Sequence, residues 1–477
     1  MTSSKLISLL RTLSKTERNR FALYLNSPLY TKKKLLSDFF MFLNRKAFGK
    51  PEKIPTRESA FRHLFPHKKF DDLRIRHLME ELLIQLENFI TINLVQANEF
   101  YFHFTMLQHA RRKELNKHVG SGMVFLENSL EKKSFRNAEY FYNRFLLEAE
   151  KSKQASSQEE RISGTDLESV NNPLDNFYII TKLKYVCEMM NERQILSGEN
   201  KLLLMDEILS HLEKNPDSYE NVPVMHIYYL IFLTLKNSGD TSNYFKLKKM
   251  LFQQSGFAEQ EEEREIFTYI QNYCIRKINA GDENFLNELF EIYKHVLDKK
   301  IIFKEGFLSP WDYKNIVVIS LRLSEFSWTE NFIEHYKNFI LSAYRENAWI
   351  YNMAKLRFHQ KDFHSTLQFL QKVNYEDVFY SLDSKTTLLK TYYELKDIVG
   401  VSSVCESFSA YLRRNRLVSQ QHKTNYKNFI HLTRLLSDCR SNGKPALEIV
   451  RNRIQETTQV ADSNWLKEKV GEMGGGG

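Results

Sequence analysis

The sequence predicts an all-α protein, with an amino-terminal helical module followed by a solenoid of antiparallel helical hairpins. Its composition is the first observation behind this fold class. Only 16 Gly and 9 Pro occur in 477 residues, roughly 5% together against about 12% in average proteins. Long spans without Pro, between residues 66 and 173, 223 and 310, and 310 and 445, contain apolar residues at helical spacing.

A recurring turn pattern is the second observation. Three short stretches lie between apolar helical patterns at a spacing of 35 residues, at 325–328, 360–363 and 395–398. This interval is typical of helix-turn-helix repeats that stack into a solenoid. We therefore expect corners near Trp328, Asp362 and Asp397 on one edge of the array. Earlier corners at Asp240 and Asp282 are more widely spaced, so the array becomes regular only toward its carboxyl end.

Positive charge is concentrated at the amino terminus. Residues 1–76 contain 18 Lys and Arg against 6 Asp and Glu, a balance of +12, whereas the remaining residues carry 50 against 53, a balance of −3. Segregated charge of this kind suggests a separate module with its own partner.

The amino-terminal module, residues 1–97, is predicted to contain five helices. The first covers about residues 4–10, and a capping box of Ser14 and Glu17 opens the second, which ends near residue 25. Thr31 is expected to cap a third helix through residue 42, and Thr56 a short one to residue 64. Asp71 and Asp72 begin a long helix with one apolar stripe: Ile75, Leu78, Met79, Leu82, Leu86, Phe89 and Ile90.

The rest of the chain divides into three further parts. Residues 98–166 form a connector of two long helices, about 98–130 and 134–153, followed by a polar linker at 154–166. Residues 167–470 are predicted to form the repeat array. The last residues, 471–477, are rich in Gly and are expected to be a flexible tail.

Two segments resemble tetratricopeptide (TPR) repeat units. Residues 348–373 carry a small residue at Ala354 and the corner Lys361-Asp362-Phe363, and residues 386–411 carry Tyr392, Lys396-Asp397 and Phe408. The match covers about residues 310–440. It departs from the usual pattern at Arg357 and Thr366, where an aromatic and Ala are common, and at Lys361 and Lys396, which replace the turn Gly. The resemblance implies a right-handed superhelix whose concave side binds peptides, helices or other proteins.

The whole chain also resembles a group of uncharacterised bacterial helical-repeat proteins. Four short runs carry this resemblance: Leu13-Ser14-Lys15-Thr16-Glu17, Ser27-Pro28-Leu29-Tyr30, Leu64-Phe65-Pro66 and Asp71-Asp72-Leu73. It implies a boundary between an amino-terminal module and a repeat array, and it brings no known activity.

Catalytic and metal-binding patterns are missing from the sequence. There is no G-x-S-x-G, phosphate-binding loop or G-x-G-x-x-G. His63 and His67 are four residues apart, but Pro66 lies between them and no Glu follows His63. The four Cys are far apart and are expected to be buried thiols of a reducing compartment. We therefore expect a protein without enzymatic activity, cofactor or metal.

The basic module offers the one predicted site, for an anionic partner or nucleic acid. The residues are Lys32, Lys33, Lys34, Arg45, Lys46, Lys68, Lys69, Arg74 and Arg76. Cations at a helix amino terminus beside a basic loop are typical of modules that contact phosphate and base edges. A solvated lysine-rich face, or one that docks an acidic protein, is the alternative interpretation.

The sequence contains no pattern for secretion or membrane insertion. Its amino terminus lacks the apolar core of a signal peptide, and the most apolar window, 224–235, is shorter than the ~20 residues needed to span a bilayer. We expect a cytoplasmic protein that acts as a scaffold or adaptor for protein-protein interaction through its array. The alternative is a regulator whose basic module binds nucleic acid while the array senses a protein partner. The partner's identity and the oligomeric state are not predicted.

Overall fold

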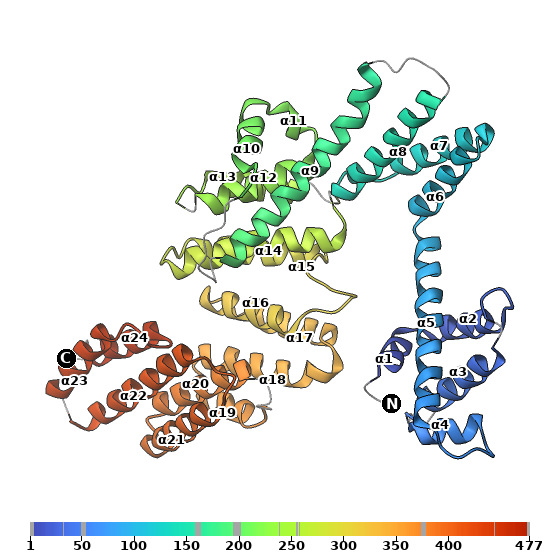
Figure 1. The fold of residues 1–477 in the computed structure, drawn as a ribbon. Helices are drawn as coiled ribbons and strands as arrows, with labels where there is room; N and C mark the ends of the chain where they lie inside the picture. Colours follow the sequence, from blue (N-terminus) through green and yellow to red (C-terminus); the bar gives the residue numbers. More distant parts are fainter. Residues whose placement is uncertain are drawn as a thin grey trace. The chain divides into compact units, whose positions relative to one another are not determined.

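The all-α fold class is confirmed by the structure, a computed structural model (Figure 1). It describes residues 4–31, 33–48, 54–157, 164–193, 202–237, 239–253, 256, 258–373, 378–442 and 444–474. These residues form 24 α-helices and one short 3-10 helix. The only β-type pairing in the described part is an isolated bridge between Lys304 and Phe307.

The chain forms two compact units, residues 1–181 and 182–477, each described here by itself. The division falls inside helix α9 (Gly164–Arg193). Of the predicted polar linker at 154–166, residues 154–157 are helical in α8 and residues 164–166 are helical in α9, while 158–163 lie outside the described residues.

Unit 1 begins with five helices: α1 (Lys5–Thr12), α2 (Lys15–Asn26), α3 (Lys34–Ala47), α4 (Arg57–Leu64) and α5 (Asp72–Ala97). In Figure 1 the long helix α5 runs through this group, and the four shorter helices pack around it. The predicted stripe of α5 faces the core. Ile75, Leu82 and Leu86 are fully buried in one cluster with Phe21, Phe40 and other side chains of α1 to α4.

The caps of these helices follow local sequence signals in three of four cases. Ser14 and Glu17 form the expected capping box, Thr56 accepts a hydrogen bond from the Ser59 N–H, and Asp71 caps α5. The prediction for Thr31 is wrong, because α3 begins at Lys34 with Lys33 as its N-cap. The Thr31 hydroxyl instead accepts a hydrogen bond from the Lys33 N–H, which forms a turn before the helix.

Unit 1 continues with α6 (Glu99–Arg112), α7 (Asn116–Glu131) and α8 (Ala138–Ser157). The single helix predicted over 98–130 is therefore wrong. The chain turns at Glu114, whose φ of 54° is left-handed, and the Leu115 N–H bonds back to the Ala110 carbonyl. This is a Schellman turn, and it escaped prediction because Glu occupies the position usually taken by Gly.

Unit 2 contains the carboxyl-terminal part of α9 and fifteen further α-helices. They are α10 (Met205–Lys214), α11 (Asp217–Glu220), α12 (Pro223–Lys236), α13 (Ser242–Gln253), α14 (Gln260–Asn279), α15 (Phe285–Asp298), α16 (Pro310–Arg322), α17 (Phe326–Tyr336), α18 (Ser342–His359), α19 (Phe363–Leu370), α20 (Val378–Glu394), α21 (Ile398–Arg414), α22 (Gln420–Asn442), α23 (Lys444–Glu456) and α24 (Ser463–Gly474).

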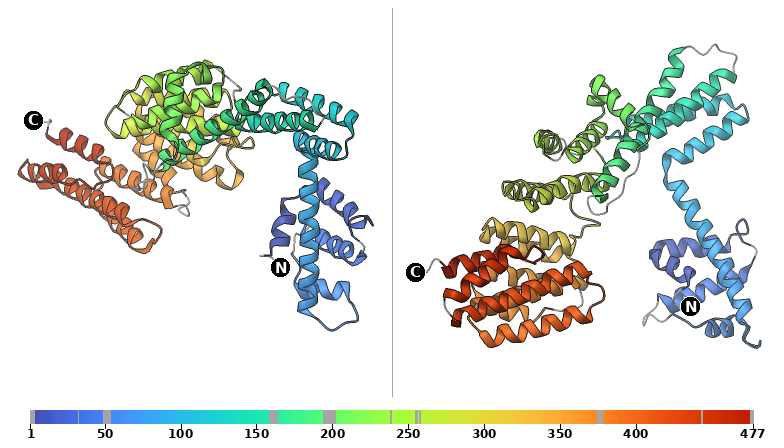
Figure 2. Two further views of the ribbon diagram at one scale, coloured as in Figure 1. Left: turned by 45° about the horizontal axis from the view of Figure 1, so that its top comes forward. Right: turned by 60° about the vertical axis from the view of Figure 1, so that its left-hand side comes forward.

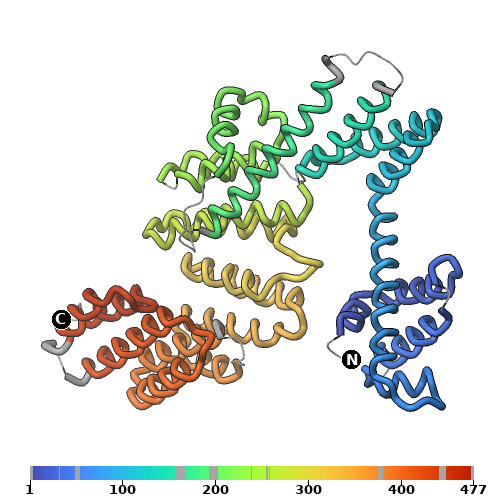
Figure 3. The backbone as a smooth tube through the Cα atoms, viewed as in Figure 1, coloured from blue at the N-terminus to red at the C-terminus, as the bar shows by residue number. Residues whose placement is uncertain are grey.

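Consecutive helices of unit 2 pack as pairs. The pairs are α12 with α13, α14 with α15, α16 with α17, α18 with α19, α20 with α21, and α22 with α23. The even-numbered helices from α16 to α24 also contact one another in succession. Figures 2 and 3 show the chain running back and forth through these pairs toward the carboxyl terminus. The even-numbered helices thus form a continuous layer.

The corners inside the later pairs share one hydrogen-bonding pattern. Ser324, Lys361 and Lys396 have φ values of 61°, 63° and 58°, and each is followed by the residue that begins or caps the next helix. The residue that follows each of them donates its backbone N–H to the carbonyl of the residue five positions earlier in the chain. Asp362, for example, donates to the Arg357 carbonyl. Lys361 and Lys396 therefore take the left-handed conformation usually supplied by Gly.

The predicted corner at Trp328 is wrong. The turn lies at Ser324 and Glu325, and Trp328 is inside α17, where its ring stacks on Phe332 at a centroid distance of 5.2 Å. The corners at Asp362 and Asp397 are confirmed, since both residues cap the following helix through their carboxylates. The Schellman turn forms from backbone bonds, so Ser324 left no distinctive side-chain pattern at the true corner.

Candidate binding surfaces

The predicted basic residues of unit 1 fall into two groups in the structure. Lys33 and Arg76 are neutralised by carboxylates on α5: Lys33 Nζ lies 2.7 Å from Glu81 and the Arg76 guanidinium 2.6 Å from Asp72. The others carry no ion pair with a described residue, and they are Lys34, Arg45, Lys46, Lys68, Lys69 and Arg74. Lys32 lies outside the described residues.

The loop before α5 contains a cation and aromatic cluster. The Arg74 guanidinium lies 4.2 Å, and the Lys68 ammonium 5.8 Å, from the centre of the Phe65 ring. Both cations are exposed, so this contact orients them and leaves their charge available. His63, considered above as a metal ligand, stacks on Phe42 at a centroid distance of 4.4 Å.

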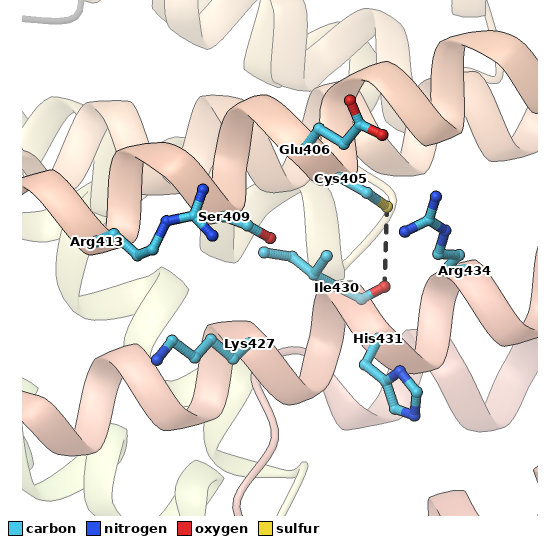
Figure 4. Close-up of a pocket in the computed structure, with 8 residues that line it drawn as sticks. All are labelled: Cys405, Glu406, Ser409, Arg413, Lys427, Ile430, His431 and Arg434. Carbon is cyan, nitrogen blue, oxygen red and sulfur yellow. Dashed lines mark hydrogen bonds between the residues drawn. The ribbon is translucent and has the colours of Figure 1, made fainter.

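A cleft between α21 and α22 is rich in cations (Figure 4). It has a volume of about 480 Å³ and is lined by Cys405, Glu406, Ser409 and Arg413 from α21, and by Lys427, Ile430, His431 and Arg434 from α22. Figure 4 shows Arg413 and Arg434 toward opposite ends of the cleft. We call these lining residues the α21–α22 cleft.

Charge in the α21–α22 cleft is poorly balanced. Arg413, Lys427 and Arg434 are exposed, and Glu406 is the one carboxylate among the lining residues. Arg434 donates a hydrogen bond to the Ser402 hydroxyl at 3.1 Å, and none of the three cations forms an ion pair with a described residue. The floor is apolar, since Cys405 is buried and its thiol donates weakly to the Ile430 carbonyl at 3.9 Å.

A larger cavity lies against the even-numbered helices of unit 2. Its volume is about 810 Å³. Most of its lining comes from three helices: Lys355, Phe358 and His359 of α18, Thr387, Lys390 and Glu394 of α20, and Trp465, Glu468, Lys469 and Glu472 of α24. Arg322, Lys361, Phe363 and Asp462 are among the further lining residues. We call this space the inner cavity.

Two ion pairs join α20 to the α24 segment on one wall of the inner cavity. Lys390 pairs with Asp462, and Lys469 Nζ lies 2.9 Å from Glu394. Burial alone would lower the pKa of Lys469, but hydrogen bonds to Glu472 and Glu394 outweigh it and hold that pKa above its usual value. This wall is therefore electrically compensated.

The α18 wall lacks this compensation. Lys355 is half-buried, and its ammonium donates to the Thr387 hydroxyl at a long distance of 3.5 Å. Burial lowers the pKa of Lys355 in spite of the nearby Asp383 carboxylate. The surrounding protein partly desolvates the His359 ring, and the positive charges of Lys355 and Lys390 add to this effect. Together they lower the pKa of His359 to about 4. His359 is consequently neutral at physiological pH.

The sequence did not single out the inner cavity or the α21–α22 cleft. Lys355 and His359 are four residues apart on one helix face, and Lys390 and Glu394 show the same spacing. Such polar stripes usually mark a solvated face. Only the fold shows that residues 390 and 462, far apart in sequence, are paired.

The thiols of unit 2 are buried side chains. All four Cys are buried and reduced, which confirms the prediction of buried thiols, and burial raises the pKa of Cys405 to about 11. In the described part of the chain, no group of three or more His, Cys, Asp or Glu is arranged to hold a metal ion. Within the same residues, no helix is both long and apolar enough to cross a bilayer.

Comparison of the chain with family models, curated proteins and solved structures gives no match. The geometry and charge of these surfaces are therefore the guide to function.

Proposed function

We propose that the protein is a non-enzymatic scaffold of the cytoplasm, and that residues 167–470 form a TPR-like solenoid that binds a protein partner. Two observations favour the proposed solenoid: the layer of successive even-numbered helices, and the repeated corners at Ser324, Lys361 and Lys396. A stacked array of this kind offers a long surface for a partner while leaving its own core intact.

The α21–α22 cleft is the observation that carries the proposal. Arg413, Lys427 and Arg434 stand exposed along it with a single acidic neighbour, Glu406. Residues 77–477 as a whole carry a balance of −3, so this positive charge is local and does not reflect a generally basic surface. A partner segment that carries Asp or Glu would satisfy it, and charge complementarity of this kind sets specificity and association rate.

The test is affinity purification of the full chain from its native cells, with mass spectrometry. Wild type is compared with R413E/K427E/R434E and with a matched reversal in unit 1, K34E/R45E/K46E. We expect the first variant to lose the main protein partner and the second to retain it, with or without nuclease. Equal recovery of every partner by both variants would contradict the proposal.

A second candidate function is nucleic-acid binding through unit 1. The observation that favours it is the set of exposed cations without ion pairs, which includes Lys34, Arg45 and Lys46. In this case the array would sense a protein partner while unit 1 contacts phosphates.

The nucleic-acid candidate has its own test with the full chain. Binding to oligonucleotides should fall steeply with salt, because each neutralised phosphate releases counterions. K34E/R45E/K46E should weaken binding to all sequences alike, whereas R74A, which removes an exposed cation without an ion pair, should disturb any sequence preference. Absence of binding even at about 50 mM salt, where counterion release favours it most, would exclude this candidate.

A further inference from the structure

We propose that the inner cavity binds an anionic small molecule, with a carboxylate or phosphate group attached to an apolar or aromatic body. This proposal does not depend on the protein partner. The cavity volume of about 810 Å³ lies in the size range of small-molecule sites, about 300 to 1,000 Å³. The lining contains cations that could bind the anionic group and aromatic rings that could contact the apolar body.

Lys355 is the group that would hold the anion. An ammonium has three donors, and the described partner of this one is the Thr387 hydroxyl at 3.5 Å. The nearest carboxylates are already engaged, since Asp383 pairs with Lys314 and Asp462 with Lys390. Lys355 therefore retains donors that face the cavity, and a charge-assisted hydrogen bond to an anion would use them.

Other hydrogen-bond donors, some of them cationic, extend the same wall. His359 lies one turn after Lys355, and Lys361 and Arg322 also line the cavity. The lowered pKa values of Lys355 and His359 indicate that burial and neighbouring positive charge both oppose further protonation here. A bound anion would relieve this positive potential, and the neutral His359 ring could donate one N–H to it.

The remaining lining suits an apolar or aromatic body. Phe358, Phe363 and Trp465 contribute rings to the cavity. The Lys390 ammonium lies 5.7 Å from the centre of the Phe358 ring on α18 and 5.3 Å from the centre of the Trp465 ring on α24. Lys390 therefore contacts the aromatic rings of both helices. An aromatic ring bound beside them would bury apolar surface while its anionic group reaches Lys355.

The first test measures protection of lysines in the full-length wild-type protein. An amine-acylating reagent is applied, and the modification rate of each lysine is followed by mass spectrometry. The probes are adenosine monophosphate with adenosine as its neutral control, and phenylacetate with phenylacetamide as its neutral control. We expect at least one anionic probe to protect Lys355 while its neutral analogue does not. Protection by one anion alone identifies a phosphate or a carboxylate ligand.

Lys385 serves as the internal control. It lies on α20, burial lowers its pKa too, and it does not line the inner cavity. Its modification rate should not change. K355M should weaken binding of the protecting probe about tenfold or more, whereas K355R and K385M should retain it.

Three results would each overturn the proposal. The first is the absence of protection by both anions at about 10 mM, a concentration well above the dissociation constant of even a weak site. The second is equal protection of Lys355 and Lys385. The third is unchanged binding of the probe to K355M.

Discussion

Replacing Lys469 with Met should weaken the attachment of α24 to α20. Lys469 Nζ lies 2.9 Å from Glu394, and the two side chains are only 9% and 14% exposed. Lys469 also contacts Glu468 and Glu472, whose side chains are 60% and 53% exposed. The substitution keeps most of the side-chain volume and removes the charge.

The magnitude depends on which carboxylate is left behind. Glu468 and Glu472 are solvated, and exposed pairs contribute little to stability. Glu394 would keep a nearly buried charge without its cation, and breaking a buried pair in this way costs about 3 to 5 kcal/mol. At the lower end, about 3 kcal/mol corresponds to a change of about 100-fold in the local opening equilibrium.

Hydrogen exchange of the α24 amides measures this opening directly. It reports local stability and does not require the whole chain to unfold in a single step. We expect exchange in residues 463–474 to become about 100-fold faster in Lys469→Met under conditions where closing is faster than chemical exchange, because the exchange rate then follows the opening equilibrium. Lys467→Met is the matched control, since Lys467 is exposed and forms no ion pair with a described residue.

A second variant separates charge from packing. Glu394→Gln combined with Lys469→Met removes the uncompensated carboxylate, so most of the lost protection should return. The reasoning would be refuted if Lys469→Met alone exchanged within about twofold of wild type, the range expected for a neutral surface change.

Two further predictions concern stability. Leu370 is 1% exposed in a cluster with Tyr351 and Val373, so Leu370→Ala should lower the free energy of unfolding by about 2 to 5 kcal/mol in denaturant titration; an effect below about 1 kcal/mol would exclude a core role. Burial raises the pKa of Asp312 to about 6. The native state then binds more protons than the unfolded state between about pH 4 and 6, so stability should fall as pH rises through this window. Asp312→Asn should remove that fall in melting temperature, and a parallel profile for both proteins would contradict it.

Features that depend on neighbouring residues could be predicted from the sequence. The capping box at Ser14 and the caps at Thr56 and Asp71 are formed by side chains within three residues of the helix start. The buried stripe of α5 follows from helical periodicity alone. From these local signals the helices of the amino-terminal module could be predicted. The corners at Asp362 and Asp397 likewise predicted the later helical hairpins.

Features made by the backbone or by distant residues could not be predicted. Turns at Glu114 and Ser324 are stabilised by backbone hydrogen bonds and carry no Gly or Pro, which is why one helix was predicted too long and one corner misplaced. The inner cavity depends on the approach of residue 462 to residue 390. The periodicity of α20 or of α24 does not encode that approach.

The charge distribution was predicted in part. The positive excess before residue 77 is visible in the sequence, but ion pairs to Glu81 and Asp72 neutralise Lys33 and Arg76. The α21–α22 cleft arises from three cations on two helices. Arg413 lies in a short basic run with Arg414 and Arg416, but Lys427 and Arg434 belong to no such run, so the sequence does not mark the cleft as a whole. Packing of the hairpin is what brings them to one cleft.

The most direct test of the scaffold proposal is cross-linking mass spectrometry of the full-length protein with its partners in native cells. Lys427 lies in the α21–α22 cleft and presents a reactive amine there. We predict cross-links from Lys427 to a protein partner, and their loss in R413E/R434E, which leaves Lys427 in place. Partner cross-links confined to the exposed lysines of unit 1, such as Lys34, Lys46 and Lys69, would contradict a partner-binding array.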